Sequence, residues 1–106
     1  IVVQTEFDFT LPKGFLDDAG TLHRHGTMRV PTGRDELILQ RDRRVRDNPA
    51  YGVLVMFSRV VTQLGSLSAL TPIQLEQLWL TDLVYCIDLF NDIAYPYEEL
   101  SLSGES

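Results

Sequence analysis

The sequence predicts an α+β fold, in which an N-terminal antiparallel β-hairpin is followed by a helical hairpin with a long C-terminal helix. Apolar and polar residues alternate over residues 3–11, and a period of two is typical of a half-buried strand. From Val53 to Leu64 the apolar residues recur in steps of three and four, which is the spacing of one helix face. A capping box at Thr71, with proline at the first helical position, begins the long helix.

Length and composition favour one domain. The 106 residues suffice for a single core, which we place at residues 1–94, and we expect residues 95–106 to form an acidic, mobile tail. Hydrophobic residues make up 44% of the chain and charged residues 23%, which argues against full disorder. No apolar run has the length of a membrane-spanning helix, and the net charge of −6 argues against a general nucleic-acid binder. We therefore expect neither a membrane nor a nucleic acid as a partner.

The number of cysteines and the first residues of the sequence indicate in which cellular compartment we expect the protein. A single cysteine, Cys86, excludes an internal disulfide and a zinc site made of cysteines alone. A lone thiol is compatible with a reducing cytosol, and the first residues lack the regions of a secretory signal. We therefore expect a cytoplasmic protein.

The strands of the hairpin are bounded by residues that break strands. Pro12 and Gly14 are expected to end the first strand, and residues 17–20 have the composition of a turn. The second strand is placed at Thr21–Val30, so the predicted hairpin has a long connection. Because two strands alone are marginally stable in water, other elements must cover their apolar face.

The segment after the hairpin contains signals for two helix starts. Thr32 is a good N-cap and is followed by acidic residues, so a short helix should begin there. Residues 40–48 carry charges of both signs and are interpreted as an exposed segment or connecting loop. Pro49 follows the capping residue Asn48, which predicts the start of the next helix. Its β-branched valines leave a strand open as an alternative, although the length favours a helix, which Gly65 should end.

The long helix, expected to run from Thr71 to Ala94, carries more apolar surface than one neighbour can cover. A first stripe at helical spacing comprises Leu75, Trp79, Leu83, Cys86, Phe90 and Ile93. A second stripe comprises Ile73, Leu80, Val84, Ile87 and Asn91. Burying a leucine or isoleucine side chain is worth about 1.5–3 kcal/mol. We infer that another chain, or a second copy of this one, covers the second stripe. The alternative is that the helices of this chain wrap both sides.

Charge is distributed unevenly along the chain. Residues 21–48 carry seven arginines against four acidic residues, whereas residues 49–106 carry one arginine against seven acidic residues. The basic stretch is interpreted as a solvated loop, with a polar docking patch at Arg41, Arg43 and Arg44 as the alternative.

No catalytic or metal-binding constellation stands out. His23 and His25 would point to the same side of a strand, but without a third ligand we interpret both as exposed strand residues. The acidic pair Asp17–Asp18 lies in turn sequence, where nothing predicts a shifted pKa. Cys86 lies on an apolar stripe, where a thiol behaves as a small hydrophobe. We therefore predict a non-enzymatic protein with no cofactor and no metal.

Several segments together carry a resemblance. The long helix contains the pattern Leu-x-x-Leu-Trp-x-x-Asp-Leu. The other segments are Thr5–Gly14, Gly20–Val30, Arg34–Glu36, Arg44–Tyr51, Ser58–Gly65 and Asp82–Phe90. They cover most of residues 5–94, and none is a catalytic signature. In this combination the chain resembles the short tail assembly proteins of contractile-tailed phages and of phage-tail-like contractile injection systems.

The resemblance implies a non-enzymatic assembly role. Tail assembly chaperones are thought to coat the apolar tape-measure helix until the tube polymerises, and the second stripe suits helix-in-groove packing. The candidate partner-binding residues are Ile73, Leu80, Val84 and Ile87, together with Arg41, Arg43 and Arg44.

The end of the chain leaves a second role open. An acidic tail stands where the family has a frameshift extension, so a structural subunit retained in the baseplate or tube end is the alternative. The expected partners are tape-measure, tube or baseplate proteins, with homo-oligomerisation also open. The expected location is cytoplasmic, or within a phage-tail-like particle.

Overall fold

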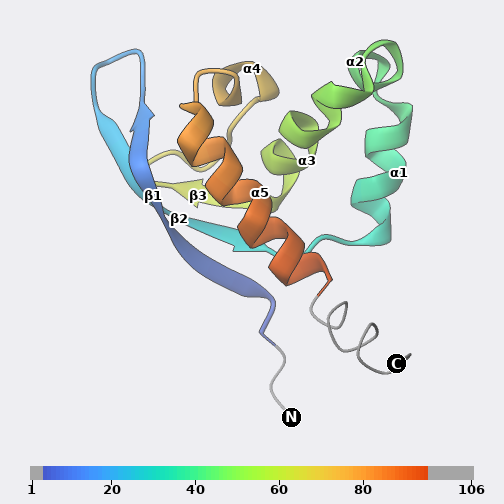
Figure 1. Ribbon diagram of the computed structural model, residues 1–106, viewed down its shortest axis with the longest axis horizontal. Coiled ribbons are helices and arrows are strands. Elements are labelled where there is room, and N and C mark those ends of the chain that lie inside the picture. The colour runs from blue at the N-terminus through green and yellow to red at the C-terminus, as the bar shows by residue number, and fades with distance from the viewer. Residues whose placement is uncertain (1–3, 96–106) are drawn as a thin grey trace.

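The computed structural model describes residues 4–95, which form a three-stranded antiparallel sheet and several helices (Figure 1). The strands, in spatial order, are β1 (Glu6–Leu16), β2 (Leu22–Arg29) and β3 (Val61–Leu64). The helices are α1 (Gly33–Arg41), α2 (Arg43–Asp47), α3 (Gly52–Val60), α4 (Pro72–Leu75) and α5 (Leu80–Ala94), with one 3₁₀ turn at Pro49–Tyr51. The predicted α+β class, with an antiparallel hairpin ahead of the helices, is confirmed.

The hairpin is longer than predicted because β1 does not end at Pro12. The strand continues through Gly14 to Leu16, and the register with β2 shifts between Thr10 and Phe15. This irregularity is compatible with Gly14, whose φ of +102° favours glycine, and an edge strand tolerates proline. The connection to β2 is therefore a short turn, and the predicted long connection is wrong.

A third strand replaces the end of a predicted helix. The helix predicted up to Leu64 ends at Val60, and residues 61–64 form β3, which pairs with β2. β-branched Val61 and Thr62 suit a strand, and the pairing with β2 decides the ambiguity that the valines created. Gly65, with φ +58°, follows this strand and does not end a helix. The first helix predicted at Thr32 is confirmed as α1, and the expected loop at residues 40–48 contains α2.

The predicted long C-terminal helix consists of two helices. Thr71 caps α4, as predicted, but residues 76–79 leave the helix, and Trp79 has extended backbone at φ −61° and ψ 145°. The break changes the direction of the chain, because α4 packs against α3 whereas α5 lies across β1 (Figure 1). Of the tail predicted at residues 95–106, only Tyr95 belongs to the described part.

One hydrophobic core lies between the sheet and the helices. Its buried members are Phe9, Leu11, Phe15, Met28, Phe57, Val60, Val61, Leu64, Leu70, Leu75, Cys86 and Ile93. Most of the first predicted stripe faces this core, but Trp79 is 58% exposed. Trp79 does not share this face, because the break before α5 takes the residue out of the helical phase. Within residues 4–95, no helix combines the length and apolar character needed to cross a bilayer.

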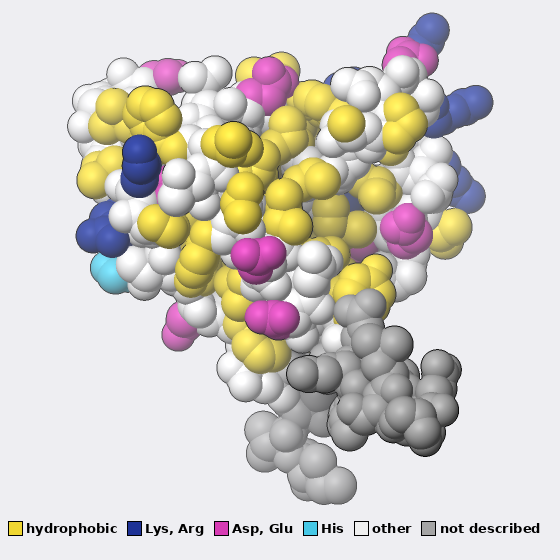
Figure 2. All heavy atoms as spheres, viewed as in Figure 1, with side chains coloured by type: hydrophobic (Ala, Val, Ile, Leu, Met, Phe, Trp, Pro, Cys, Tyr) yellow, Lys and Arg dark blue, Asp and Glu magenta, His cyan; other side chains and the backbone are white. Residues whose placement is uncertain are grey.

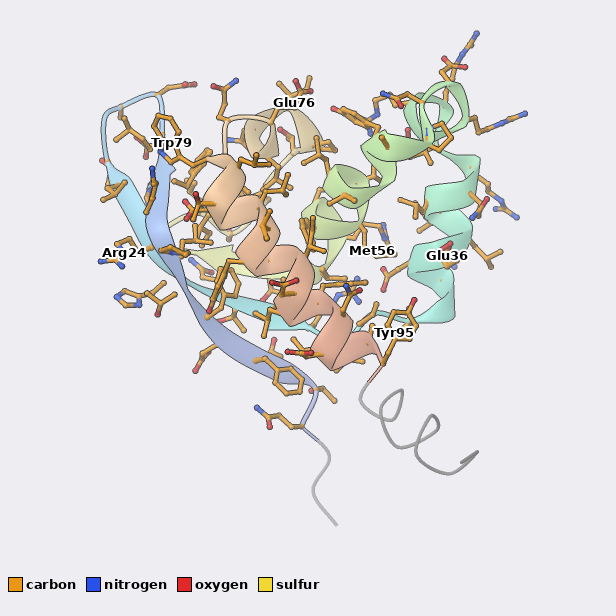
Figure 3. The ribbon with its side chains drawn as sticks, in the orientation of Figure 1. Arg24, Glu36, Met56, Glu76, Trp79 and Tyr95 are labelled. Carbon is orange, nitrogen blue, oxygen red and sulfur yellow. The ribbon has the colours of Figure 1, made fainter. Side chains whose placement is uncertain are left out.

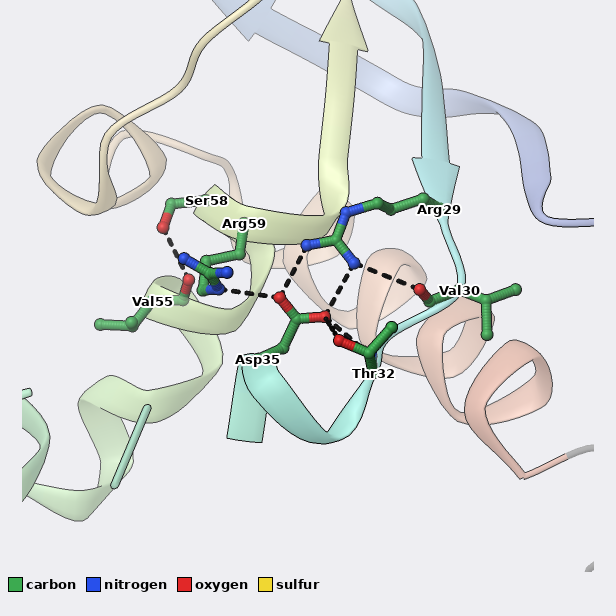
Figure 4. A network of polar contacts seen from close by, with 7 residues as sticks. All are labelled: Arg29, Val30, Thr32, Asp35, Val55, Ser58 and Arg59. Carbon is green, nitrogen blue, oxygen red and sulfur yellow. Dashed lines mark hydrogen bonds and ion pairs between the residues drawn. The ribbon is translucent and has the colours of Figure 1, made fainter. Parts of the chain in front are cut away.

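A buried carboxylate joins the sheet to α1 and α3 (Figure 4). Asp35, in the first turn of α1, is 1% exposed. Arg29 at the end of β2 donates to both of its oxygens at 2.7 Å, and Arg59 of α3 donates to Oδ1 at 2.8 Å. The backbone N–H of Thr32 donates to Oδ2 at 2.8 Å. The hydrogen bonds from Arg29, above all, hold the pKa of Asp35 well below its ordinary value, although burial opposes this shift.

We expect Asp35→Asn to lower the free energy of unfolding by about 2–4 kcal/mol, because two arginines lose their shared anion. Since the pKa of Asp35 is lower in the folded than in the unfolded chain, this stabilisation is present in full above the unfolded pKa of about 4 and disappears as the pH falls through the folded pKa. Urea unfolding at several pH values measures both effects.

The matched control is Glu36→Gln, a neighbouring exposed carboxylate whose replacement should change stability by less than about 0.5 kcal/mol. Equal stability of the two variants at neutral pH would contradict the anchoring role of Asp35.

Candidate partner-binding surface

A second buried carboxylate sets the orientation of α5. Asp82, in the first turn of α5, is fully buried. Its Oδ1 accepts the backbone N–H of Lys13 at 2.8 Å, and its Oδ2 accepts that of Gly14 at 2.9 Å. One turn later, the hydroxyl of Tyr85 accepts the backbone N–H of Thr10 at 3.3 Å. Both contacts tie α5 to β1, so the helix cannot rotate about its axis without breaking them.

With α5 fixed in this way, its outer face carries apolar side chains in solvent. Leu80 is 74% exposed and Val84 is 48% exposed. They lie on the side opposite buried Asp82 and Cys86, so α5 is apolar on both faces. Ile73 is 66% exposed but belongs to α4, so the predicted second stripe is interrupted. Ile87 is half-buried because it faces a groove.

An apolar groove runs between α3 and α5, and we call it the α3–α5 groove. Val53 and Ile87 border both of the hollows that compose it, so they lie where the two hollows meet. Its other apolar lining residues are Leu39, Met56, Phe57, Phe90 and Tyr95 at one end and Ala50, Leu54, Leu75, Leu78 and Leu83 at the other. Figure 2 shows hydrophobic side chains gathered along α5 and into this hollow. Sequence reasoning identified Ile87 but missed the opposite wall, because it did not place α1 and α3.

The charged residues that line the α3–α5 groove are acidic. Glu36 of α1 lies at the same end as Met56 and Tyr95, and Glu76 lines the other end (Figure 3). Glu76 accepts a hydrogen bond from the hydroxyl of Tyr51 at 3.0 Å, which places its carboxylate beside the groove. A ligand with apolar side chains and flanking positive charge would complement this lining.

The predicted arginine patch lies apart from the exposed face of α5. Arg41 ends α1, and Arg43 and Arg44 lie in α2, on the far side of the molecule from the start of α5 (Figure 1). All three are exposed. Arg44 forms an ion pair with Asp42 at 2.8 Å, and its guanidinium carbon lies 5.5 Å from the ring centroid of Tyr51. The structure therefore does not bring the two sets of predicted binding residues together.

His23 is buried, contrary to the prediction of an exposed strand residue. It is 4% exposed, and a β-carbon at Gly65 would lie 2.1 Å from its Nδ1, so glycine is needed beside it. Its Nε2 lies 2.7 Å from Asp17 Oδ2, and the backbone N–H of Ser66 donates to Nδ1 at 3.4 Å. The hydrogen bond with His23 is the main cause that lowers the pKa of Asp17. The pair is structural: it holds the loop after β3 against the hairpin turn.

The other histidine and the cysteine lie apart from each other and from any metal-ligating cluster in the described part of the chain. His25 is exposed and contacts Thr10 Oγ1 at 3.1 Å, separately from His23. Among residues 4–95, no cluster of three metal-ligating side chains occurs. Burial, and then the nearby charge of Asp82, raise the pKa of the Cys86 thiol to about 12.

Comparisons with protein-family models, with curated proteins and with solved structures found no match to this chain. Inferences about function therefore depend on the exposed face of α5, on the α3–α5 groove and on the resemblance of the sequence.

The Cys86 thiol should be inert in the folded protein, because it is buried and its raised pKa keeps it protonated near pH 8. We expect a disulfide reagent such as DTNB to react at least about a hundredfold more slowly with the folded than with the urea-unfolded chain. The signal is unambiguous because the sequence has one cysteine. Rapid labelling of the folded chain would show that α5 does not pack on the core as described.

Proposed function

We propose that this protein is a non-enzymatic assembly protein of a contractile phage tail or phage-tail-like injection system, and that it acts as a chaperone for an apolar helix of the tape-measure protein. The observation that carries the proposal is the outer face of α5, where Leu80 and Val84 are exposed on a helix that is also apolar on its core side. A large apolar surface beside a groove is typical of protein-binding sites.

The geometry supports a helix as the bound element. The α3–α5 groove is bordered by two helices, with Val53 on one wall and Ile87 on the other, and Val84 stands on α5 beside it. An amphipathic helix inserts apolar residues at spacings of three and four into such a groove. Covering Leu80 and Val84 would contribute about 1.5–3 kcal/mol for each side chain.

The acidic residues of the α3–α5 groove indicate which charges a bound helix should carry beside its apolar face. Because Glu36 and Glu76 line its two ends, we expect lysine or arginine beside the apolar face of the bound helix. Such flanking pairs are exposed to solvent, so they contribute more to orientation and to the association rate than to affinity.

Leu80→Asp should weaken binding to the tape-measure protein by about tenfold to a hundredfold, because it places a charge where an apolar side chain is covered. Folding should be unaffected, since Leu80 is 74% exposed. Co-expression of the two proteins followed by titration calorimetry of the purified pair measures the change.

Leu37→Asp is the matched control, because it makes the same substitution at a leucine that is 58% exposed on α1 and does not line the α3–α5 groove. We expect wild-type binding from this variant. Equal affinity of Leu80→Asp and the unchanged chain would exclude the outer face of α5 as the contact.

A chaperone and a retained subunit differ in their presence in the finished particle. We expect quantitative mass spectrometry to find this chain in crude lysate with the tape-measure protein and not in purified, sheathed particles. A fixed copy number in particles washed at high salt would replace the chaperone role with that of a structural subunit of the baseplate or tube end.

A further inference from the structure

A second exposed surface lies at the hairpin end of the molecule, and we call it the Lys13–Trp79 patch. It comprises Lys13, Leu16, Leu22, Arg24 and Trp79. Leu16 and Leu22 face each other across the hairpin and are 57% and 53% exposed. The Nζ of Lys13 lies 5.4 Å from the ring centroid of Trp79, which is itself 58% exposed. Figure 3 shows Trp79 and Arg24 at this same end.

The patch is continuous because its members surround Gly14. A β-carbon at Gly14 would lie 2.8 Å from Cγ of Arg24 and 3.0 Å from Cδ1 of Leu22, so both side chains lie directly over this glycine. Lys13 precedes it and extends to Trp79. An exposed tryptophan, two exposed leucines and two cations thus occupy one surface. Tryptophan and arginine are the residues most enriched in the energetic centres of protein interfaces.

The two cations of the patch lack a carboxylate partner in the described part of the chain, because Asp17 and Asp82 bind other groups. Both oxygens of Asp82 accept backbone N–H groups, and Asp17 binds His23. Within residues 4–95, neither Lys13 nor Arg24 takes part in an ion pair. Arg24 donates only to backbone carbonyls of the β1 irregularity. A ligand for this surface therefore needs large apolar side chains together with carboxylates.

The sequence of this chain contains such a segment. After Tyr95 it continues Pro-Tyr-Glu-Glu-Leu-Ser-Leu, in which Tyr97, Leu100 and Leu102 accompany two adjacent glutamates. We propose that residues 97–102 of one copy bind the Lys13–Trp79 patch of a second copy. This association is independent of the tape-measure contact, which uses Leu80 and Val84.

The length of α5 favours binding of the acidic segment to the patch of a second copy over binding to the patch of its own copy. The patch lies at the start of α5, and residues 97–102 follow its end, about 22 Å away along 15 helical residues. Even fully extended, the four residues from Tyr95 to Glu99 span at most about 14 Å. A return path along α5 would also pass the exposed carboxylates of Asp88 and Asp92. The backbone of the two glutamates therefore falls short of the patch of its own copy, whereas a second copy can approach the segment directly.

The proposed contact joins two different surfaces, so it is head-to-tail. Each copy offers one patch and one acidic segment. In an open assembly of any length, the copy at one end therefore keeps a free patch and the copy at the other end keeps a free segment. Interfaces of this type close into rings or extend as open filaments.

Sedimentation velocity of the full chain, combined with fluorescence, tests the proposal. Trp79 is the single tryptophan of the sequence, so its emission reports on the patch directly. We expect assemblies beyond the dimer to form with rising concentration across the micromolar range, with a parallel change in Trp79 emission, and to weaken with added salt. A monomer with constant emission throughout this range would overturn the proposal.

Charge reversal identifies the two surfaces. Lys13→Glu and the double variant Glu98→Lys with Glu99→Lys should each raise the dissociation constant on the order of tenfold or more. Arg46→Glu, an equal charge reversal on exposed α2, should leave it unchanged. Circular dichroism establishes that each variant is folded. Association that survives both reversals, or that Arg46→Glu weakens equally, would overturn the assignment.

Mixing the variants tests the head-to-tail arrangement. Each variant alone should stay monomeric, and a mixture of the two should associate, because the intact patch of one meets the intact segment of the other and the two reversed surfaces also carry opposite charges. Combining all three substitutions in one chain should restore association. If Glu98→Lys with Glu99→Lys alters Trp79 emission at a dilution where the chain is monomeric, the segment binds within its own copy and the second-copy proposal fails.

Discussion

The carboxylate of Asp35 is the point at which the sheet and the helical part of the molecule meet. Arg29 arrives from β2, Arg59 from α3, and Thr32 from the start of α1, and all donate to the same two oxygens. A carboxylate that is 1% exposed is stable only when its oxygens are fully engaged, as they are here. The position of α1 and α3 relative to the sheet, and hence one wall of the α3–α5 groove, depends on this junction.

Asp82 performs the corresponding task for the other wall. By binding the backbone of β1 through both oxygens, it fixes which side of α5 faces the core. Rotating α5 to bury Leu80 would withdraw Asp82 from those N–H groups and leave a buried charge without partners. The polar contact of Asp82 therefore keeps Leu80 and Val84 exposed, and the fold does not gain the stabilisation that burying these two side chains would give. In α5, the exposed apolar face that could bind a partner lowers the stability that the isolated fold could otherwise reach.

Local signals in the sequence sufficed for the elements that depend on local chemistry. The alternation in β1, the N-cap at Thr32 and the capping box at Thr71 all appear where predicted. Features that depend on distant partners were not predictable: β3 forms because β2 offers an edge, and His23 is buried by a loop more than forty residues away. For the candidate site, the surplus apolar face of α5 was readable from its spacing. The groove was not, because its second wall requires the fold.

Asp82 binds backbone N–H groups of β1 and not side chains. The attachment of α5 to β1 is therefore independent of the side chains that β1 presents to solvent. The side chain at position 13 can change without loss of the hydrogen bond that its amide donates. Gly14 has no such freedom, because its φ is positive and Arg24 and Leu22 occupy the space of a β-carbon. Related chains could therefore diverge in which neighbours they recognise while keeping the same attachment of α5, with the glycine as the invariant residue of the pair.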